Sequence, residues 1–237
     1  MITTNGTVID GADINSDIVV QANNVTIKRS RILSGSASWA VLLESGYTGL
    51  TLSYVEVGPQ PGQHPDRAIQ SNGTNMTVDH VYVHGTQRGV ATGDGTRVTN
   101  SYIDDLDNSS GNHATAVMSL GGVQNVVVQG NTLGCGTGEC SSAMSVYPQW
   151  GPNDNWTIDN NLFNGGSYCV YLGYSPASGE SPNTNMRVTN NGFGSKYSAN
   201  CGIYGPVASW SWSTGNTWTN NTWYTPGTSK NGTTVTP

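Results

Sequence analysis

Two arginines, Arg67 and Arg88, stand just before two strand-like stretches that occupy the same place in successive repeats of the chain. On neighbouring strands their side chains would lie one or two strand spacings apart, and they would repel each other unless an anion sat between them. A carboxylate held in this way, beside a group that exchanges protons, is what β-elimination of a uronic acid needs. The proton next to a carboxylate becomes acidic only when that charge is neutralised. We therefore predict Arg88, with His113 or Tyr171 handling protons, as the catalytic residues, and Arg67 as a substrate-binding residue.

The acidic residues offer two competing interpretations. Asp66 and Glu139 fall near the arginines in the repeat and would pair with them, which would leave a solvated rim without chemistry. They would otherwise serve as the two carboxylates of a glycoside hydrolase, which stand roughly 5 to 10 Å apart. About three repeats separate them, roughly 14 Å at one strand spacing per repeat, so only long loops would bring them together. Hydrolysis is therefore the weaker of the two enzymatic hypotheses.

A third group of acids, Asp104, Asp105 and Asp107, crowds one turn together with Asn108. Hard oxygen ligands of this kind bind Ca²⁺, although the spacing matches no known calcium loop and a capped, solvated turn explains the same residues. The four cysteines offer a Cys₄ metal site as the rival to two disulfides, although no Cys-x-x-Cys occurs and the pairs belong to different loops. The predicted chemistry itself requires no cofactor.

Aromatic residues concentrate in the C-terminal half, several of them in loops such as 148–152. Sugar rings present flat C–H faces that stack on aromatic side chains. These residues alone would suffice for a non-catalytic glycan-binding or adhesin module, which is the third hypothesis. The predicted substrate-binding residues combine the aromatics with polar groups near the arginines, and they are Arg67, Gln70, His84, Glu139, Tyr147, Trp150 and Tyr204.

A regular repeat must position all of these residues. Asn131, Asn161, Asn191 and Asn221 recur every 30 residues, each three places after a large apolar residue. A fixed period indicates stacked, nearly identical units. Segments such as 156–158 alternate apolar and polar residues as strands do, and 31 glycines help to interrupt the apolar runs. Most coils hold a second strand-like stretch, the last at 202–204, where Ile203 would face the core; the outward row of these stretches would be Leu42, Gln70, Ala91, Met118, Ser145, Tyr171 and Tyr204. His80 falls in the same turn column as Asn160 and Asn190, so we predict a turn residue there. The sequence therefore predicts an all-β fold in which residues 1–237 form a single parallel solenoid domain of about nine coils, with an Asn ladder at one turn.

These features resemble the right-handed parallel β-helix proteins of the pectate-lyase-like superfamily, over nearly the whole chain. Three stretches, 7–11, 24–30 and 190–194, are similar to a group of small secreted bacterial β-helix proteins without a firm activity. Members of that group often carry His-Asn-Asp-Gly where this chain reads His-Ala-Thr-Ala at 113–116, so acid chemistry is not expected at that point. The resemblance implies a right-handed helix that binds glycans along one outer sheet and its flanking loops.

The charge and the cysteine content limit the classes of binding partner and the cellular setting of the protein. A net charge of −6 with nine Lys and Arg disfavours a nucleic-acid partner, and no apolar run approaches the roughly 20 residues that span a bilayer. The favoured disulfides are Cys135–Cys140 and Cys169–Cys201, although other connectivities are possible. Disulfides indicate an extracellular setting, and no leader is visible at the N-terminus, so we expect that a secretion signal has been removed. We expect a secreted monomer whose partner is a polysaccharide or oligosaccharide.

Overall fold

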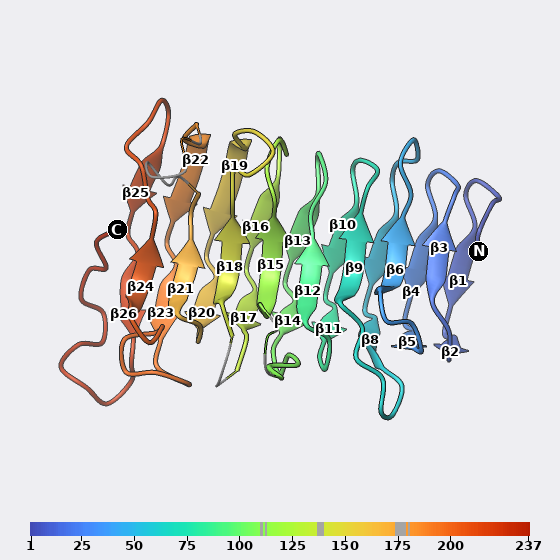
Figure 1. The fold of residues 1–237 in the computed structure, drawn as a ribbon, viewed down its shortest axis with the longest axis horizontal. Helices are drawn as coiled ribbons and strands as arrows, with labels where there is room; N and C mark the ends of the chain where they lie inside the picture. Colours follow the sequence, from blue (N-terminus) through green and yellow to red (C-terminus); the bar gives the residue numbers. More distant parts are fainter. Residues whose placement is uncertain (110, 112, 137–139, 174–178, 180) are drawn as a thin grey trace.

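The computed structural model describes residues 1–237 except 110, 112, 137–139, 174–178 and 180. The chain is a single parallel β-solenoid in which each coil adds a strand to each of three sheets (Figure 1). Two sheets have nine strands and the third has eight, which confirms the predicted fold class. The described part of the chain contains no helix that could cross a membrane.

The strands of each sheet follow one another at intervals of about one coil. The first sheet consists of β1 (Val8–Asp10), β4 (Thr26–Lys28), β7 (Thr51–Ser53), β10 (Thr77–Asp79), β13 (Arg97–Thr99), β16 (Val127–Gln129), β19 (Asp154–Asp159), β22 (Thr184–Thr189) and β25 (Thr217–Thr219). The second consists of β2 (Asp13–Ile14), β5 (Arg31–Ser34), β8 (Glu56–Pro59), β11 (Tyr82–Val83), β14 (Tyr102–Ile103), β17 (Thr132–Gly134), β20 (Leu162–Asn164), β23 (Gly192–Gly194) and β26 (Thr222–Tyr224). The third consists of β3 (Ile18–Val20), β6 (Trp39–Leu43), β9 (Arg67–Ser71), β12 (Arg88–Ala91), β15 (Thr115–Ser119), β18 (Ser142–Val146), β21 (Tyr168–Tyr171) and β24 (Gly205–Ala208).

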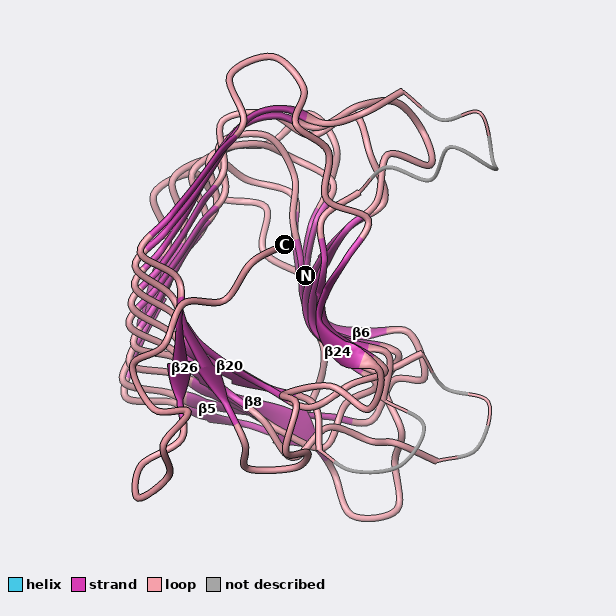
Figure 2. Cartoon of the chain, turned by 90° about the vertical axis from the view of Figure 1, so that its left-hand side faces the viewer, coloured by secondary structure: helices cyan, strands magenta, loops and turns pink. Residues whose placement is uncertain are grey.

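Residues that face the axis form one continuous core. The apolar anchors of the first sheet pair in register from coil to coil, and those from Ile27 to Val188 are buried. The anchors of the two end coils, Ile9 and Trp218, are only half-buried because each packs against a neighbouring coil on one side. Seen along the long axis, the coils superimpose as a three-sided outline, with the first and second sheets meeting at a sharp corner (Figure 2). One buried face per strand explains why the sequence alternates at period two.

The predicted Asn ladder lies at the corner between the first and second sheets. The amide Nδ2 of Asn131 donates to Val98 O at 2.9 Å and to Asn161 Oδ1 at 2.9 Å, and the Asn131 N–H donates to the same Oδ1 at 3.0 Å. The same three bonds recur from Asn161 to Asn191 and from Asn191 to Asn221. Each amide thus satisfies buried backbone groups of the turn while it bonds the next coil.

A second ladder, which the sequence interpretation missed, lies between the third and first sheets. The N–H and Nδ2 of Asn153 donate to Asn183 Oδ1 at 2.8 and 3.0 Å, and Ser119 Oγ donates to Asn153 Oδ1 at 2.7 Å. Asn153 and Asn183 are a single pair in two successive coils, so the sequence shows no repeating asparagine at this turn. This pair holds the chain as it leaves the third sheet.

A column of left-handed residues turns the chain from the first sheet into the second. Each residue lies two places before a paired position of the second sheet and has a positive φ, between 48° and 71°. Most coils place Gly or Asn here, which tolerate this conformation best. The column runs Gly11, Arg29, Tyr54, His80, Asn100, Gly130, Asn160, Asn190 and Asn220. The prediction that His80 is a turn residue is confirmed.

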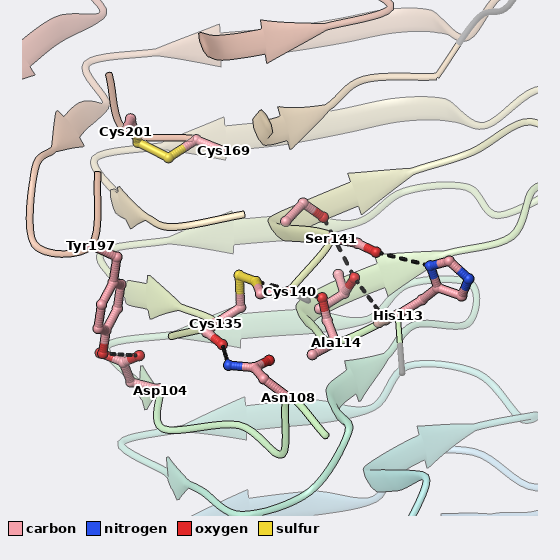
Figure 3. The surroundings of a disulfide bond; sticks show 12 residues. Asp104, Asn108, His113, Ala114, Cys135, Cys140, Ser141, Cys169, Tyr197 and Cys201 are labelled. Carbon is pink, nitrogen blue, oxygen red and sulfur yellow. Dashed lines mark hydrogen bonds between the residues drawn. A yellow bond between two sulfur atoms is a disulfide. The ribbon is translucent and has the colours of Figure 1, made fainter. Parts of the chain in front are cut away.

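Both predicted disulfides are present, and no described cysteine is free. Cys135–Cys140 closes a short loop after β17, and Cys169–Cys201 ties β21 to the segment before β24 (Figure 3). The predicted strand at residues 202–204 is wrong, because Gly205–Ala208 forms the strand instead. Ile203, which was expected to face the core, is 59% exposed.

Candidate functional site

The outer face of the third sheet carries a groove of about 230 Å³. Its walls come from β9, β12 and β15 and from the segments that follow β15 and β18. The groove brings together three of the predicted substrate-binding residues, Arg67, Gln70 and Trp150. Met118 and Leu120 add an apolar floor between the polar end and the tryptophan.

A local irregularity of the strands explains how Arg67 and Gln70 both face outward although three residues separate them. Ala68 and Ile69 are both fully buried, so the strand turns two consecutive side chains inward where regular alternation would turn one. The paired residues of the next strand repeat this arrangement, with Arg88 beside Arg67 and Ala91 beside Gln70. The outer face therefore has two rows of side chains along the solenoid axis.

The second of these rows matches the predicted outward row except at its end. Register aligns Leu42, Gln70, Ala91, Met118, Ser145 and Tyr171 in successive strands. The next place belongs to Ala208 and not to Tyr204, because the last strand begins three residues later than predicted. Leu42 and Met118 are 1% and 6% exposed although they are not part of the axial core, so side chains and loops on the outer face cover them.

Asp66 neutralises part of the charge of the predicted arginine pair. Arg88 Nη1 donates to Asp66 Oδ1, and Arg67 Nε lies 3.5 Å from Asp66 Oδ2. Arg67 Nη1 also donates to Gln70 Oε1 at 2.7 Å, which fixes the amide at the mouth of the groove. Burial lowers the pKa of both arginines, yet a guanidinium stays protonated near neutral pH. The ion pair expected under the alternative interpretation is present for Asp66, and the three charges together sum to one positive charge.

The two predicted proton-handling residues lie at different distances from Arg88. His113 precedes Thr115, the residue that pairs with Arg88, by two places, and its exposed ring places Nδ1 3.2 Å from Ser141 Oγ (Figure 3). Tyr171 lies three strands away along the axis, roughly 14 Å at the usual strand spacing. Arg88 and Tyr171 therefore do not meet on one sugar unit, whereas Arg88 and His113 stand on neighbouring strand ends.

Tyr171 belongs to a tyrosine cluster on the same outer face. Its ring centroid lies 5.7 Å from that of Tyr147 and 5.5 Å from that of Tyr168, which in turn lies 5.8 Å from Tyr204. Burial, with the neighbouring tyrosines, raises the pKa of Tyr147 and of Tyr171. Both phenols are protonated near neutral pH and can donate hydrogen bonds or present flat ring faces, but they do not supply a ready base.

Three other predicted substrate-binding residues, His84, Tyr147 and Tyr204, do not line the groove. His84 lies on the second sheet, where its Nε2 is 3.1 Å from Glu56 Oε1 and its ring stacks on Tyr82 with centroids 4.7 Å apart. The chain turns between β11 and β12, so His84 follows a strand of the second sheet whereas Arg88 begins a strand of the third. Glu139 lies outside the described residues, so the predicted carboxylate pair with Asp66 has only one described member.

The sequence interpretation did not single out a histidine–carboxylate pair beside the arginines. His64 Nδ1 lies 2.9 Å from Asp107 Oδ2, and the histidine is exposed whereas the carboxylate is nearly buried. Burial raises the pKa of Asp107, but hydrogen bonds from Ser109 and His64 outweigh it and the net shift is downward. The two residues are 43 positions apart in the sequence, so no local spacing predicts their contact.

The acidic turn at 104–107, where a calcium site is predicted, contacts basic and aromatic side chains. Asp104 is buried and accepts hydrogen bonds from Lys196 Nζ at 2.7 Å, from Tyr197 Oη at 2.8 Å (Figure 3) and from Tyr102 Oη at 3.2 Å. Asp107 faces His64 instead of Asp104. Across the described part of the chain, no three His, Cys, Asp or Glu side chains gather closely enough to hold a metal ion.

Comparison with known proteins supports the fold. No protein-family model matches the chain, and no curated protein matches its sequence. The Dettilon tailspike protein (gp208) is similar in structure, with a TM-score of 0.56 and 14% identity over 95% of this chain and 54% of that one. A tailspike protein, gp49, of Acinetobacter baumannii bacteriophage Fri1, a capsular polysaccharide depolymerase, gives a TM-score of 0.31 and 10% identity over 85% of this chain and 50% of that one.

At these identities the likeness to the Dettilon tailspike shows the parallel solenoid alone, and the second score is too low to carry an argument. The chain spans about half the length of both of these solved structures. Function must therefore be argued from the groove.

Proposed function

We propose that the protein is a carbohydrate-active β-helix protein that binds a linear polysaccharide along the outer face of the third sheet. The observation that carries this proposal is the groove that joins Arg67 and Gln70 to Trp150. Trp150 is 71% exposed, so its ring face is available for a sugar, while Gln70 and Arg67 offer hydrogen bonds to hydroxyl or carboxylate oxygens.

The tyrosine cluster extends the same binding face. Gln70 and Tyr171 occupy equivalent positions four strands apart, about 19 Å along the axis. A face of this length suits several consecutive sugars of a chain laid parallel to the axis. The single positive charge left by Arg67, Arg88 and Asp66 favours a glycan with acidic sugars at that end.

The finer proposal is β-elimination of a uronic-acid-containing glycan, as in the pectate-lyase-like proteins that the sequence resembles. Arg88 would neutralise the uronate carboxylate, and His113 on the neighbouring strand end would accept the proton next to it. The electron pair of that C–H bond would form the double bond as the bond to the glycosidic oxygen breaks, and this oxygen would take up a proton from His113 or from water. Tyr171 would bind the chain instead of moving protons, because it lies three strands away and burial favours its protonated form. Hydrolysis has less support, since no carboxylate lines the groove among the described residues.

Binding is tested by affinity electrophoresis and calorimetry with alginate, pectate, glucuronan and glycosaminoglycans. For the glycan that retards the protein in the gel, Trp150→Ala should lower the affinity about fivefold, which corresponds to about 1 kcal/mol of stacking. Trp212→Ala is the matched control, because Trp212 is 70% exposed but does not line the groove. Equal affinities for the two variants would refute the groove as the binding site.

Cleavage is tested on the same glycans by following the ultraviolet absorbance of unsaturated uronates. An increase that is lost in Arg88→Lys and His113→Gln, both still folded, would support elimination. New reducing ends without this absorbance would indicate hydrolysis. Binding without either product would leave a glycan-binding module and would refute the catalytic part of the proposal.

A further inference from the structure

The left-handed turn column contains bulky residues in three consecutive coils. Arg29 and Tyr54 have φ values of 48° and 56°, at positions where other coils use Gly or Asn. His80, with a φ of 53°, follows them. Bulky side chains seldom adopt this conformation, and such strain persists where the surrounding structure or a function compensates for it. The strain therefore points to the surface that these side chains form.

The neighbouring positions of the second sheet continue this surface with aromatic rings. Tyr54 stacks on His80 with centroids 4.5 Å apart. Tyr82 lies between His84, at 4.7 Å, and Tyr102, at 5.7 Å. Tyr54, Tyr82 and Tyr102 are 60%, 38% and 40% exposed, so part of each ring is open to a ligand beside its stacked neighbours. We call the outer surface formed by Arg29, Arg31, Tyr54, Glu56, His80, Tyr82, His84 and Tyr102 the tyrosine face.

The equivalent positions of the C-terminal coils carry no aromatic residue at Thr132, Leu162 or Gly192. The row that contains Tyr82 and Tyr102 continues as Thr132, Leu162 and Gly192. The turn column continues there as Gly and Asn. A purely structural requirement of the coil would apply to both halves of the solenoid, so it does not explain the rings.

A large open groove crosses the N-terminal part of the tyrosine face. Its volume is about 720 Å³, and Arg29, Arg31, Tyr54 and Glu56 line it. Lys28 also lines this groove and shares Asp10 with Arg29, and Arg31 Nη2 lies 2.7 Å from Asp13 Oδ2. With Glu56, three cations face three carboxylates, so their charges sum to zero. An anionic ligand would have to displace these carboxylates, whereas a neutral ligand with hydroxyl groups can bond to both partners of each pair.

We propose that the tyrosine face is a second saccharide-binding site, separate from the groove of the third sheet, and that it takes a neutral sugar chain. The rings of Tyr54 and Tyr82 stack on sugar C–H faces, and Arg31 and Glu56 bond the hydroxyl groups. The site lies on a different sheet from Arg88 and His113, so it anchors a glycan and takes no part in cleavage. Both sites assume a saccharide ligand, but neither requires the other.

The four histidines provide a direct test that separates the two sites. His80 and His84 belong to the tyrosine face, whereas His64 and His113 lie near the arginines beside the third-sheet groove. We would titrate the full chain with cellohexaose, xylohexaose and maltohexaose, with an alginate hexamer as the anionic comparison, and follow the imidazole signals by NMR. A neutral hexamer that shifts the signals of His80 and His84 and leaves those of His64 and His113 unchanged supports the proposal.

The opposite results would overturn it. No shift of His80 and His84 with any of the neutral hexamers, or a shift with alginate alone, would show that this face does not bind a neutral sugar chain. Shifts confined to His64 and His113 would support the third-sheet groove and refute the tyrosine face as a saccharide site.

A substitution at Tyr54 tests whether the residue with the strained backbone also binds the neutral hexamer. Tyr54→Asn places in this coil the residue that fits the left-handed turn, so its Tm should rise by about 2–4 °C while affinity for the neutral hexamer falls about fivefold. Asn160→Tyr, the reverse change in a C-terminal coil, is the control: its Tm should fall and its affinity should stay the same. Unchanged affinity in Tyr54→Asn would show that the ring is not part of a binding site.

Discussion

Asn161→Ala should destabilise the solenoid more than its small change in volume suggests. Asn161 is 2% exposed, and its Oδ1 accepts the N–H and the Nδ2 of Asn131. Its Nδ2 donates to Val128 O and to Asn191 Oδ1. The variant leaves the buried N–H of Asn131 without this acceptor, which costs about 1–3 kcal/mol, and removes three more hydrogen bonds worth about 0.5–1.5 kcal/mol each. Because Asn191 Oδ1 and Asn131 Nδ2 keep other partners, we expect a loss of about 3 kcal/mol, near the lower end of that sum.

Chemical denaturation and thermal unfolding measure this loss, and about 3 kcal/mol corresponds to a decrease of about 6–12 °C in Tm for a chain of this size. Asn160→Gly is the control, because Asn160 is exposed and has a φ of 53° that glycine adopts freely. Its free energy of unfolding should change by less than about 0.5 kcal/mol. Hydrogen exchange should show the largest increase at the N–H of Asn131. Equal effects of the two variants would refute the assignment of the buried amide as the stabilising element.

Three further changes test other contacts of the fold. Replacing Cys169 and Cys201 together by serine should lower the free energy of unfolding by about 3.7 kcal/mol, the loop entropy of a 32-residue separation. A loss below about 1 kcal/mol in denaturant titrations would contradict this value. Lys196→Met should lower the free energy of unfolding by about 1.5–3 kcal/mol at pH 7, the value of a hydrogen bond to a charged group, because Tyr197 and Tyr102 still donate to the buried Asp104. Full stability of this variant in denaturant titrations would contradict a stabilising role for the ion pair. Burial raises the pKa of Tyr197 from 10.0 to about 12, so the native protein binds the phenolic proton more tightly than the unfolded chain, and this contribution to stability is lost as pH rises from 10 to 12. In Tyr197→Phe the free energy of unfolding should therefore fall less steeply over that range, and an equal slope would contradict the inferred shift.

The repeat made most of the fold predictable. The asparagines recur every 30 residues, and the apolar anchors share their frame at spacings of 18 to 30 residues. The anchors bury one face of each strand, and the asparagines satisfy the polar groups of a turn. Both disulfides followed from the same frame, because the paired cysteines lie in one loop or in adjoining coils. The error at residues 202–204 has a physical reason. A disulfide and a left-handed Cys201 redirect the chain just before the last strand of the third sheet, and neither leaves a period in the sequence.

The candidate site was less predictable, because its contacts join coils through long side chains. The sequence placed Arg67 beside Arg88 correctly, but it did not determine that Asp66 would bond both. The outer face to which His84 belongs depends on where the chain turns between β11 and β12, which alternation alone does not give. Trp150 reaches the groove from a loop, so its position depends on the path of that loop and not on the repeat.

The unequal lengths of the coils have a mechanical consequence. In register, 18 residues separate Ile9 from Ile27, against 30 between Val128 and Ile158. Each coil is held by its neighbours alone, so tension applied to the two ends would detach coils one at a time from an end. A detached C-terminal coil releases about 100 Å of contour length and the shortest N-terminal coil about 60 Å, at about 3.3–3.6 Å per residue. The Cys169–Cys201 bond shortens one of these extensions, because the 32 positions that it spans, about one coil, stay covalently closed under load.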